Sequence, residues 1–158
     1  MSVGNLEDLG LGDLQQLHET DDYQWLLTNI KLLRNKQFDQ LDLENLIEEL
    51  TDLGNEKKNA VESLLQQVIR HLLLYQYWHV EIERNSGHWQ AEIYNFRDQV
   101  NSKLTSNLRS HLVAEMPKIY QRALGYVQRK TNYQIDFPRE SPYSLEQLLD
   151  INYLGCLS

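Results

Sequence analysis

Apolar residues recur with a helical period through the middle of the chain, from Leu43 to Tyr75. The phase of the pattern is the same on both sides of Gly54, which two helices joined by a turn would have no reason to share. The pattern predicts one long helix from about residue 42 to about residue 84, with Asp42 as its N-cap. The stripe consists of Leu43, Leu46, Ile47, Leu50, Leu53, Val61, Leu64, Leu65, Val68, Leu72 and Tyr75.

The segment that begins at Gly54 leaves a second interpretation open. Glycine inside a helix costs about 1 kcal/mol relative to alanine. Lys57 and Lys58 also occupy stripe positions, so the stripe is polar there. In this alternative, one helix ends at Gly54 and another begins at Asn55.

Shorter helical patterns lie on either side of this stretch. One helix is expected from Asp21 or Asp22 to about Lys36, where basic residues suit a helix C-terminus. A turn is expected at residues 85–87, followed by helices over 88–101 and 107–130. Pro117 should kink or divide the latter helix. The spacing of Ser144 and Gln147 is typical of a capping box that starts a short last helix.

No stretch shows the alternating pattern of a strand. We therefore predict an all-α fold, a helical bundle organised along the central helix and closed by a C-terminal wrapping segment. Residues 1–20 are expected to form a loosely held arm, and residues 21–158 a single domain.

Charge is distributed unevenly along the chain. Residues 1–56 hold 13 acidic and 3 basic residues, a net charge of −10 within a total of −8. Residues four apart on one helix face carry like charge, which should repel within an isolated helix. This acidic row suggests either a solvated face or a surface that meets a basic partner or a metal. Glu44, Glu48, Asp52 and Glu56 have this spacing, and Glu49 lies on the same face; together these five residues are called the acidic row.

The expected helix over residues 107–130 carries the opposite charge, with Arg109, Lys118, Arg122 and Arg129 as its main cations. These side chains could contact the phosphates of a nucleic acid. However, the isoelectric point of about 5.1 is far below the value of about 9 that is usual for nucleic-acid-binding domains. The alternative is that they face the acidic row, in the same molecule or in a second copy.

Two groupings of histidine and glutamate raise the question of a metal site. His79/Glu83 and His88/Glu92 are i, i+4 pairs on either side of the expected turn at residues 85–87. Two helices meeting at that turn would bring together two imidazoles and two carboxylates, a possible zinc ligand set. Ordinary exposed pairs would give the same spacing.

The second grouping is Glu48, Glu49 and His71. On a continuous helix these residues lie far apart, so they could meet only across an antiparallel dimer or through a fold at Gly54. The alternative is a buried histidine that is hydrogen-bonded to a neighbouring group. We expect no cofactor, since nucleotide-binding glycine loops and nucleophile motifs are absent from the sequence.

The single cysteine, Cys156, permits no disulfide within the chain, which suits a cytoplasmic protein. Its neighbours include no base that would lower its pKa toward reactivity. The longest apolar run is interrupted by Arg70, His71 and Gln76, so a membrane span is not expected.

Four segments carry a resemblance to a known family: FDQLDLENLIEELTDLG, HLLLYQYW, the SGHW stretch with Arg97 downstream, and FPRESPYSLEQLLD. Over residues 21–152 the chain resembles a bacterial family, abundant in cyanobacteria, that is catalogued as domain of unknown function number twenty-nine. The resemblance implies a helical fold but no activity, ligand or catalytic residue. Ser141 departs from the family, which often has cysteine before the closing proline.

Three functions follow as hypotheses. The first is a non-catalytic protein-interaction or structural module that binds a protein partner or forms a homo-oligomer. The second is a metal-binding bundle or metal-dependent enzyme that uses Glu and His side chains. The third is nucleic-acid binding through residues 107–130.

Overall fold

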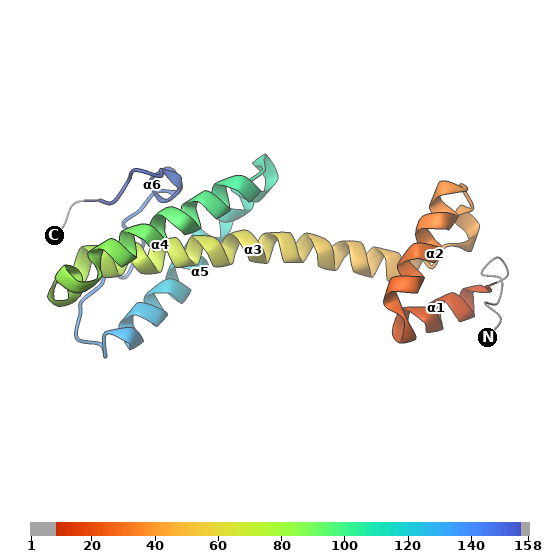
Figure 1. Ribbon diagram of the computed structural model, residues 1–158, viewed down its shortest axis with the longest axis horizontal. Coiled ribbons are helices and arrows are strands. Elements are labelled where there is room, and N and C mark those ends of the chain that lie inside the picture. The colour runs from red at the N-terminus through yellow and green to blue at the C-terminus, as the bar shows by residue number, and fades with distance from the viewer. Residues whose placement is uncertain (1–8, 156–158) are drawn as a thin grey trace. The chain divides into compact units, whose positions relative to one another are not determined.

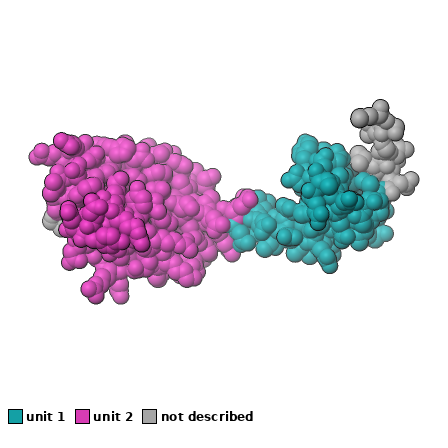
Figure 2. Space-filling view, turned by 90° about the horizontal axis from the view of Figure 1, so that it is seen from below, with its two compact units in different colours: residues 1–55 teal, residues 56–158 magenta. Residues whose placement is uncertain are grey.

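The computed structural model of the chain describes residues 9–155. These residues contain helices and no β-strand, so the predicted all-α fold is confirmed (Figure 1). The chain divides into two compact units, residues 1–55 and residues 56–158 (Figure 2). Among the described helices, none combines the length and the apolar character needed to cross a membrane.

Unit 1 contains α1 (Leu11–Thr20), α2 (Asp22–Arg34), the 3₁₀ helix η2 (Phe38–Gln40) and the first turns of α3. α1 is a regular helix with Leu14 buried, where the sequence predicts a loosely held arm. The side chain of Asp21 caps α2 by accepting a hydrogen bond from the Gln24 amide at 3.0 Å, as predicted. At the other end, Lys36 adopts a positive φ of 56° that stops the helix.

The interior of unit 1 is small and contains a polar network. Asp42 and Asn29 are fully buried, and Trp25 is 1% exposed. The Trp25 indole N–H donates to Asp42 Oδ2 at 2.9 Å, and Asn45 Nδ2 donates to the same oxygen at 2.7 Å. Asn29 Oδ1 accepts from the backbone N–H of Asp42 at 3.3 Å. The network fixes α2 against the residue that precedes α3.

α3 (Leu43–Tyr77) is continuous through Gly54, so the alternative of two separate helices is wrong. A Cβ atom at Gly54 would meet nothing within 4 Å, so packing within the chain does not require glycine there. The predicted end of the helix at residue 84 is also wrong, because α3 ends at Tyr77.

The chain reverses direction at Trp78, whose φ of −94° and ψ of 69° leave the helix. The 3₁₀ helix η3 (His79–Glu81) follows, and α4 runs from Ile82 to Lys103. The turn predicted at residues 85–87 is therefore wrong, since those residues lie inside α4. Because the chain reverses at Trp78, the ring of this residue stacks on that of Trp89, with the centroids 6.0 Å apart. Tertiary packing therefore places a turn at a point where the sequence has no glycine or proline.

Unit 2 packs the remainder of α3 with α4, α5 (Ser106–Lys130) and α6 (Leu145–Leu149) around one hydrophobic core. α5 is not divided by Pro117. The predicted capping box is present at α6, where Ser144 Oγ accepts from the Gln147 amide and Gln147 Oε1 accepts from the Ser144 amide. The most deeply buried core residues include Val61, Leu65, Val68, Ile69, Leu72, Leu73, Val100, Leu112, Ile119, Ala123, Val127 and Leu148.

The carboxylate of Glu62 on α3 contacts the side chains of His111 and Arg122 on α5. Its Oε1 lies 2.7 Å from His111 Nε2, and its Oε2 accepts from Arg122 Nη1 at 3.0 Å. The Glu62 side chain is 14% exposed, so this contact is shielded from water more than an ordinary surface pair. It fixes the orientation of α5 on α3.

The C-terminal segment is held by its buried apolar side chains and by side-chain hydrogen bonds to its backbone, and Arg97 of α4 is the centre of these hydrogen bonds. Its fully buried guanidinium donates to the carbonyl oxygens of Gln147, Leu148 and Tyr153. Burial lowers the Arg97 pKa to about 10, so the group stays charged at neutral pH. The predicted wrapping segment is thus anchored by a cationic side chain that donates hydrogen bonds to main-chain carbonyls.

A second contact closes the end of this segment. Gln76 Nε2 donates to the Leu154 carbonyl at 2.7 Å, and its Oε1 accepts from the Tyr143 hydroxyl at 2.7 Å. Gly155 has a φ of 72°, and a Cβ atom there would lie 1.8 Å from Gln76 Nε2. Glycine is therefore required where the chain passes over Gln76.

Replacing Arg97 should strongly destabilise unit 2. Arg97→Leu leaves three carbonyls without their donor, which we expect to lower the free energy of unfolding by about 3 kcal/mol or more. The free energy of unfolding of Arg97→Lys should lie between those of Arg97→Leu and the parent protein, because an ammonium cannot reach all three acceptors. Urea unfolding measures the loss. The exposed Arg84 on the same helix provides the control, and equal losses in Arg84→Leu and Arg97→Leu would contradict the assigned role.

Stability should also fall in alkali. Burial raises the pKa of Tyr120 to about 12 and also raises that of Tyr143, whereas an unfolded tyrosine ionises near 10. The unfolded state therefore loses protons first, and stability decreases as pH rises from about 10 toward 12. Unfolding experiments at stepped pH test this. The decrease should be shallower in Tyr120→Phe, and an unchanged slope in that variant would refute the assignment.

Candidate functional site

An apolar face of α3 is uncovered in unit 1. Leu43, Ile47 and Leu50 are 60%, 57% and 65% exposed, and their i, i+4, i+7 spacing places them on one side of the helix. We call these three residues the α3 stripe. The other exposed large apolar side chains described in this unit are Leu11, Tyr23, Leu26, Leu27, Leu33, Phe38 and Leu53. Clustered apolar exposure of this kind is typical of surfaces that bind another molecule.

Glu44 and Glu48, the first residues of the acidic row, flank this stripe. Glu44, Glu48 and Asp52 are exposed, and no ion pair involves them within residues 9–155. Glu49 differs, because its Oε1 lies 2.7 Å from His18 Nε2 of α1. Glu56 is exposed as well but belongs to unit 2. The row thus combines unpaired carboxylates with one that helps dock α1.

The predicted basic residues of α5 have partners within unit 2. Arg109 pairs with Glu146 at 2.8 Å, Lys118 with Glu115 at 2.9 Å, and Arg122 with Glu62 at 3.0 Å. Arg129 donates to the Gly125 carbonyl. In the described residues, none of these side chains pairs with the acidic row. Their role as interaction residues stays a prediction.

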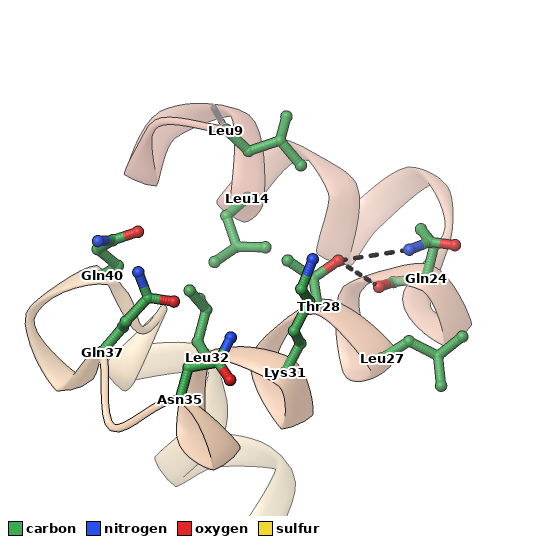
Figure 3. A pocket seen from close by; sticks show the side chains of 10 residues that line it. All are labelled: Leu9, Leu14, Gln24, Leu27, Thr28, Lys31, Leu32, Asn35, Gln37 and Gln40. Carbon is green, nitrogen blue, oxygen red and sulfur yellow. Dashed lines mark hydrogen bonds between the residues drawn. The ribbon is translucent and has the colours of Figure 1, made fainter. Parts of the chain in front are cut away.

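A cavity of about 600 Å³ lies in unit 1 (Figure 3). Leucine side chains of α1 and α2 face it, and Asn35, Gln37 and Gln40 line one side. Thr28 lines it too, and its hydroxyl donates to the Gln24 carbonyl at 2.8 Å. Among the described lining residues there is a lysine, Lys31, but no carboxylate, although the unit is strongly acidic. The sequence analysis missed these amides because they belong to no motif.

The predicted metal groupings are not assembled. Within residues 9–155, no cluster of three or more His, Cys, Asp or Glu side chains could hold a metal ion. His79 lies in η3 and Glu83, His88 and Glu92 lie on the single helix α4, so there is no meeting of two helices at residues 85–87. Glu48 and Glu49 lie many turns from His71 on the continuous α3. Cys156 lies outside the described residues.

His71 is a partly buried histidine bonded to its own helix. Its Nδ1 lies 2.7 Å from the Gln67 carbonyl oxygen, as the alternative interpretation predicts. Because a carbonyl only accepts, Nδ1 carries the proton. Burial lowers the pKa of His71, which favours the neutral ring. Structure also brings His71 and His88 to one cleft, a proximity that the sequence spacing did not indicate.

Fold and surface together define an all-α protein that presents an uncovered apolar helix face. The chain belongs to the family described as domain of unknown function DUF29, whose model matches residues 17–154. This agrees with the resemblance noted from the sequence over residues 21–152. No curated protein matches the chain, and no solved structure matches it.

The network around Asp42 positions the start of the α3 stripe and should respond to substitution in a graded way. Asp42→Ala leaves the buried Trp25 N–H without an acceptor, which we expect to cost about 1–3 kcal/mol. Asp42→Asn keeps an acceptor for Trp25 and should cost less. Urea unfolding and the indole N–H resonance of Trp25 provide the measurements. An equal or larger loss for Asp42→Asn would contradict the assigned role of the side-chain oxygen as the acceptor for Trp25.

Proposed function

We propose that the protein is a non-catalytic interaction module that docks a basic amphipathic helix of a partner protein on the α3 stripe. The observation that carries this proposal is the exposure of three successive apolar residues on one helix face, each more than half accessible. An amphipathic helix laid against such a face buries apolar area on both sides. Within residues 9–55, no other element covers these three side chains.

Charge identifies the class of partner. Glu44 and Glu48 each follow a stripe residue by one position, so they lie at the edge of the stripe. Their carboxylates lack ion pairs in the described structure, and residues 1–56 carry a net charge of −10 (3 basic minus 13 acidic residues). A partner helix with lysine or arginine beside its apolar stripe would complement both features. A second copy of the same acidic face would be repelled.

Neither alternative from the sequence gains support from an observation in the structure. The basic side chains of α5 are engaged within unit 2, and the described residues form no metal-ligand cluster. A bacterial, largely cyanobacterial origin and a cytoplasmic location remain parts of the proposal that rest on the resemblance and on the single cysteine.

A designed peptide tests the docking surface. The probe is a helical peptide with leucines on one face and lysines elsewhere, and its control carries glutamates in place of the lysines. We expect the full chain to bind the lysine peptide in a salt-sensitive manner. Ile47→Glu should weaken binding about tenfold or more, because it places a charge in the apolar contact. Isothermal titration calorimetry measures both affinities.

Val113→Glu is the matched control, since Val113 is an equally exposed apolar residue of α5 at 57%. Equal binding by the Ile47→Glu and Val113→Glu variants would overturn the proposed surface. Light scattering provides a second check. A stable dimer of the parent chain that Ile47→Glu converts to a monomer would identify a second copy, rather than a basic partner, as the occupant.

A further inference from the structure

A cleft of about 290 Å³ lies among α3, α4 and α5 in unit 2. Its volume is at the small end of the range for sites that bind small molecules. The side chains that line it combine aromatic rings with polar and charged groups. The lining residues used below are His71, Trp78, Asn85, Trp89, Tyr126 and Lys130.

One wall of the cleft is aromatic. The rings of Trp78 and Trp89 are stacked, with centroids 6.0 Å apart and planes inclined by 21°. Neither indole N–H has a hydrogen-bond partner among the described residues. A planar apolar group is the kind of ligand body that packs on such a surface, and the indoles add donors at its edge.

Lys130 brings a positive charge to the cleft. Arg70 lies 4.0 Å from the centroid of the Tyr126 ring, and the Lys130 ammonium lies 5.8 Å from the same centroid. Arg70 does not line the cleft, and its Nε is buried without a hydrogen-bond partner in the described structure. Glu81 is tied to the Asn85 amide at 3.1 Å. Glu92 is the carboxylate whose charge acts on His71, and it does not line the cleft.

His71, which lines the cleft, offers an acceptor. Because the Nδ1–H of His71 donates to the Gln67 carbonyl, the other nitrogen of the neutral ring, Nε2, carries a lone pair. Burial keeps the pKa of this histidine below its usual value, so the ring remains an acceptor at neutral pH. The cleft therefore presents one cationic donor, the Lys130 ammonium, together with the acceptor on His71.

We propose that this cleft binds a small planar organic acid that also carries a hydroxyl or N–H donor. The planar body packs on Trp78 and Trp89, the acidic group lies beside Lys130, and the donor faces Nε2 of His71. Two of the three histidines singled out as metal-ligand candidates, His71 and His88, then belong to a ligand site without a metal. This site is separate from the docking surface on the α3 stripe, and each can fail without the other.

Titration of the ¹⁵N-labelled full chain with 4-hydroxybenzoate tests the proposal. A ligand of this size is expected to bind with a dissociation constant of about 1 mM. We expect saturable shifts of the indole N–H resonances of Trp78 and Trp89, with Trp25 unchanged. Benzoate lacks the donor and should bind several-fold more weakly, and tyramine carries a cation and should bind at least about tenfold more weakly.

Lys130→Gln should weaken 4-hydroxybenzoate binding about tenfold, because it removes the cation that faces the acid. Lys103→Gln is the matched control, since Lys103 is an exposed lysine at the C-terminal end of α4. Three results would each overturn the proposal: no shift of the Trp78 and Trp89 resonances, equal affinity for tyramine, or equal losses in the two lysine variants.

Discussion

A buried guanidinium facing three main-chain carbonyls is the contact on which the architecture of unit 2 depends. The segment after α5 contains one helix of five residues, so it has few backbone bonds of its own. Arg97 supplies donors at the C-terminal end of that helix, where carbonyls lack partners and the helix dipole is negative. Asn101, one turn along α4, repeats the contact by donating to the Leu149 carbonyl at 3.0 Å. The last helix is thereby ordered by the side chains beneath it rather than by its own length.

The two units use apolar residues in different ways. In unit 2 the apolar face of α3 is covered by α4 and α5, and residues such as Val61, Leu65 and Leu72 are fully buried. In unit 1 the fold is fixed by the Trp25–Asp42 network, while Leu43, Ile47 and Leu50 of the same helix remain accessible. A unit with so little buried apolar area has limited stability of its own. Covering its exposed leucines would therefore stabilise it, which is the physical basis for expecting a partner there.

Local signals in the sequence predicted much of the helical structure and less of its tertiary arrangement. The unbroken phase across Gly54 correctly indicated a continuous α3, and the Ser144–Gln147 spacing correctly indicated the last helix. The predicted end of α3 was too late by several residues. The chain reverses at Trp78, where the ring stacks on that of Trp89 eleven positions further on, and this tertiary contact has no local signal in the sequence. The Arg97 anchor and the cleft beside His71 were missed for the same reason, since each joins residues from elements distant in sequence. The acidic row was found from spacing alone, but its function stays a prediction.

Glu62 has a mechanical consequence for α5. Its two oxygens contact His111 and Arg122, which lie six residues before and five residues after Pro117. Proline has no N–H, so the backbone bond to the carbonyl of Val113 is missing and the helix is weakest to bending at this point. A single carboxylate on the neighbouring helix therefore ties the two halves of α5 together across the weak point. The resistance of α5 to bending at Pro117 therefore comes partly from a contact with the neighbouring helix.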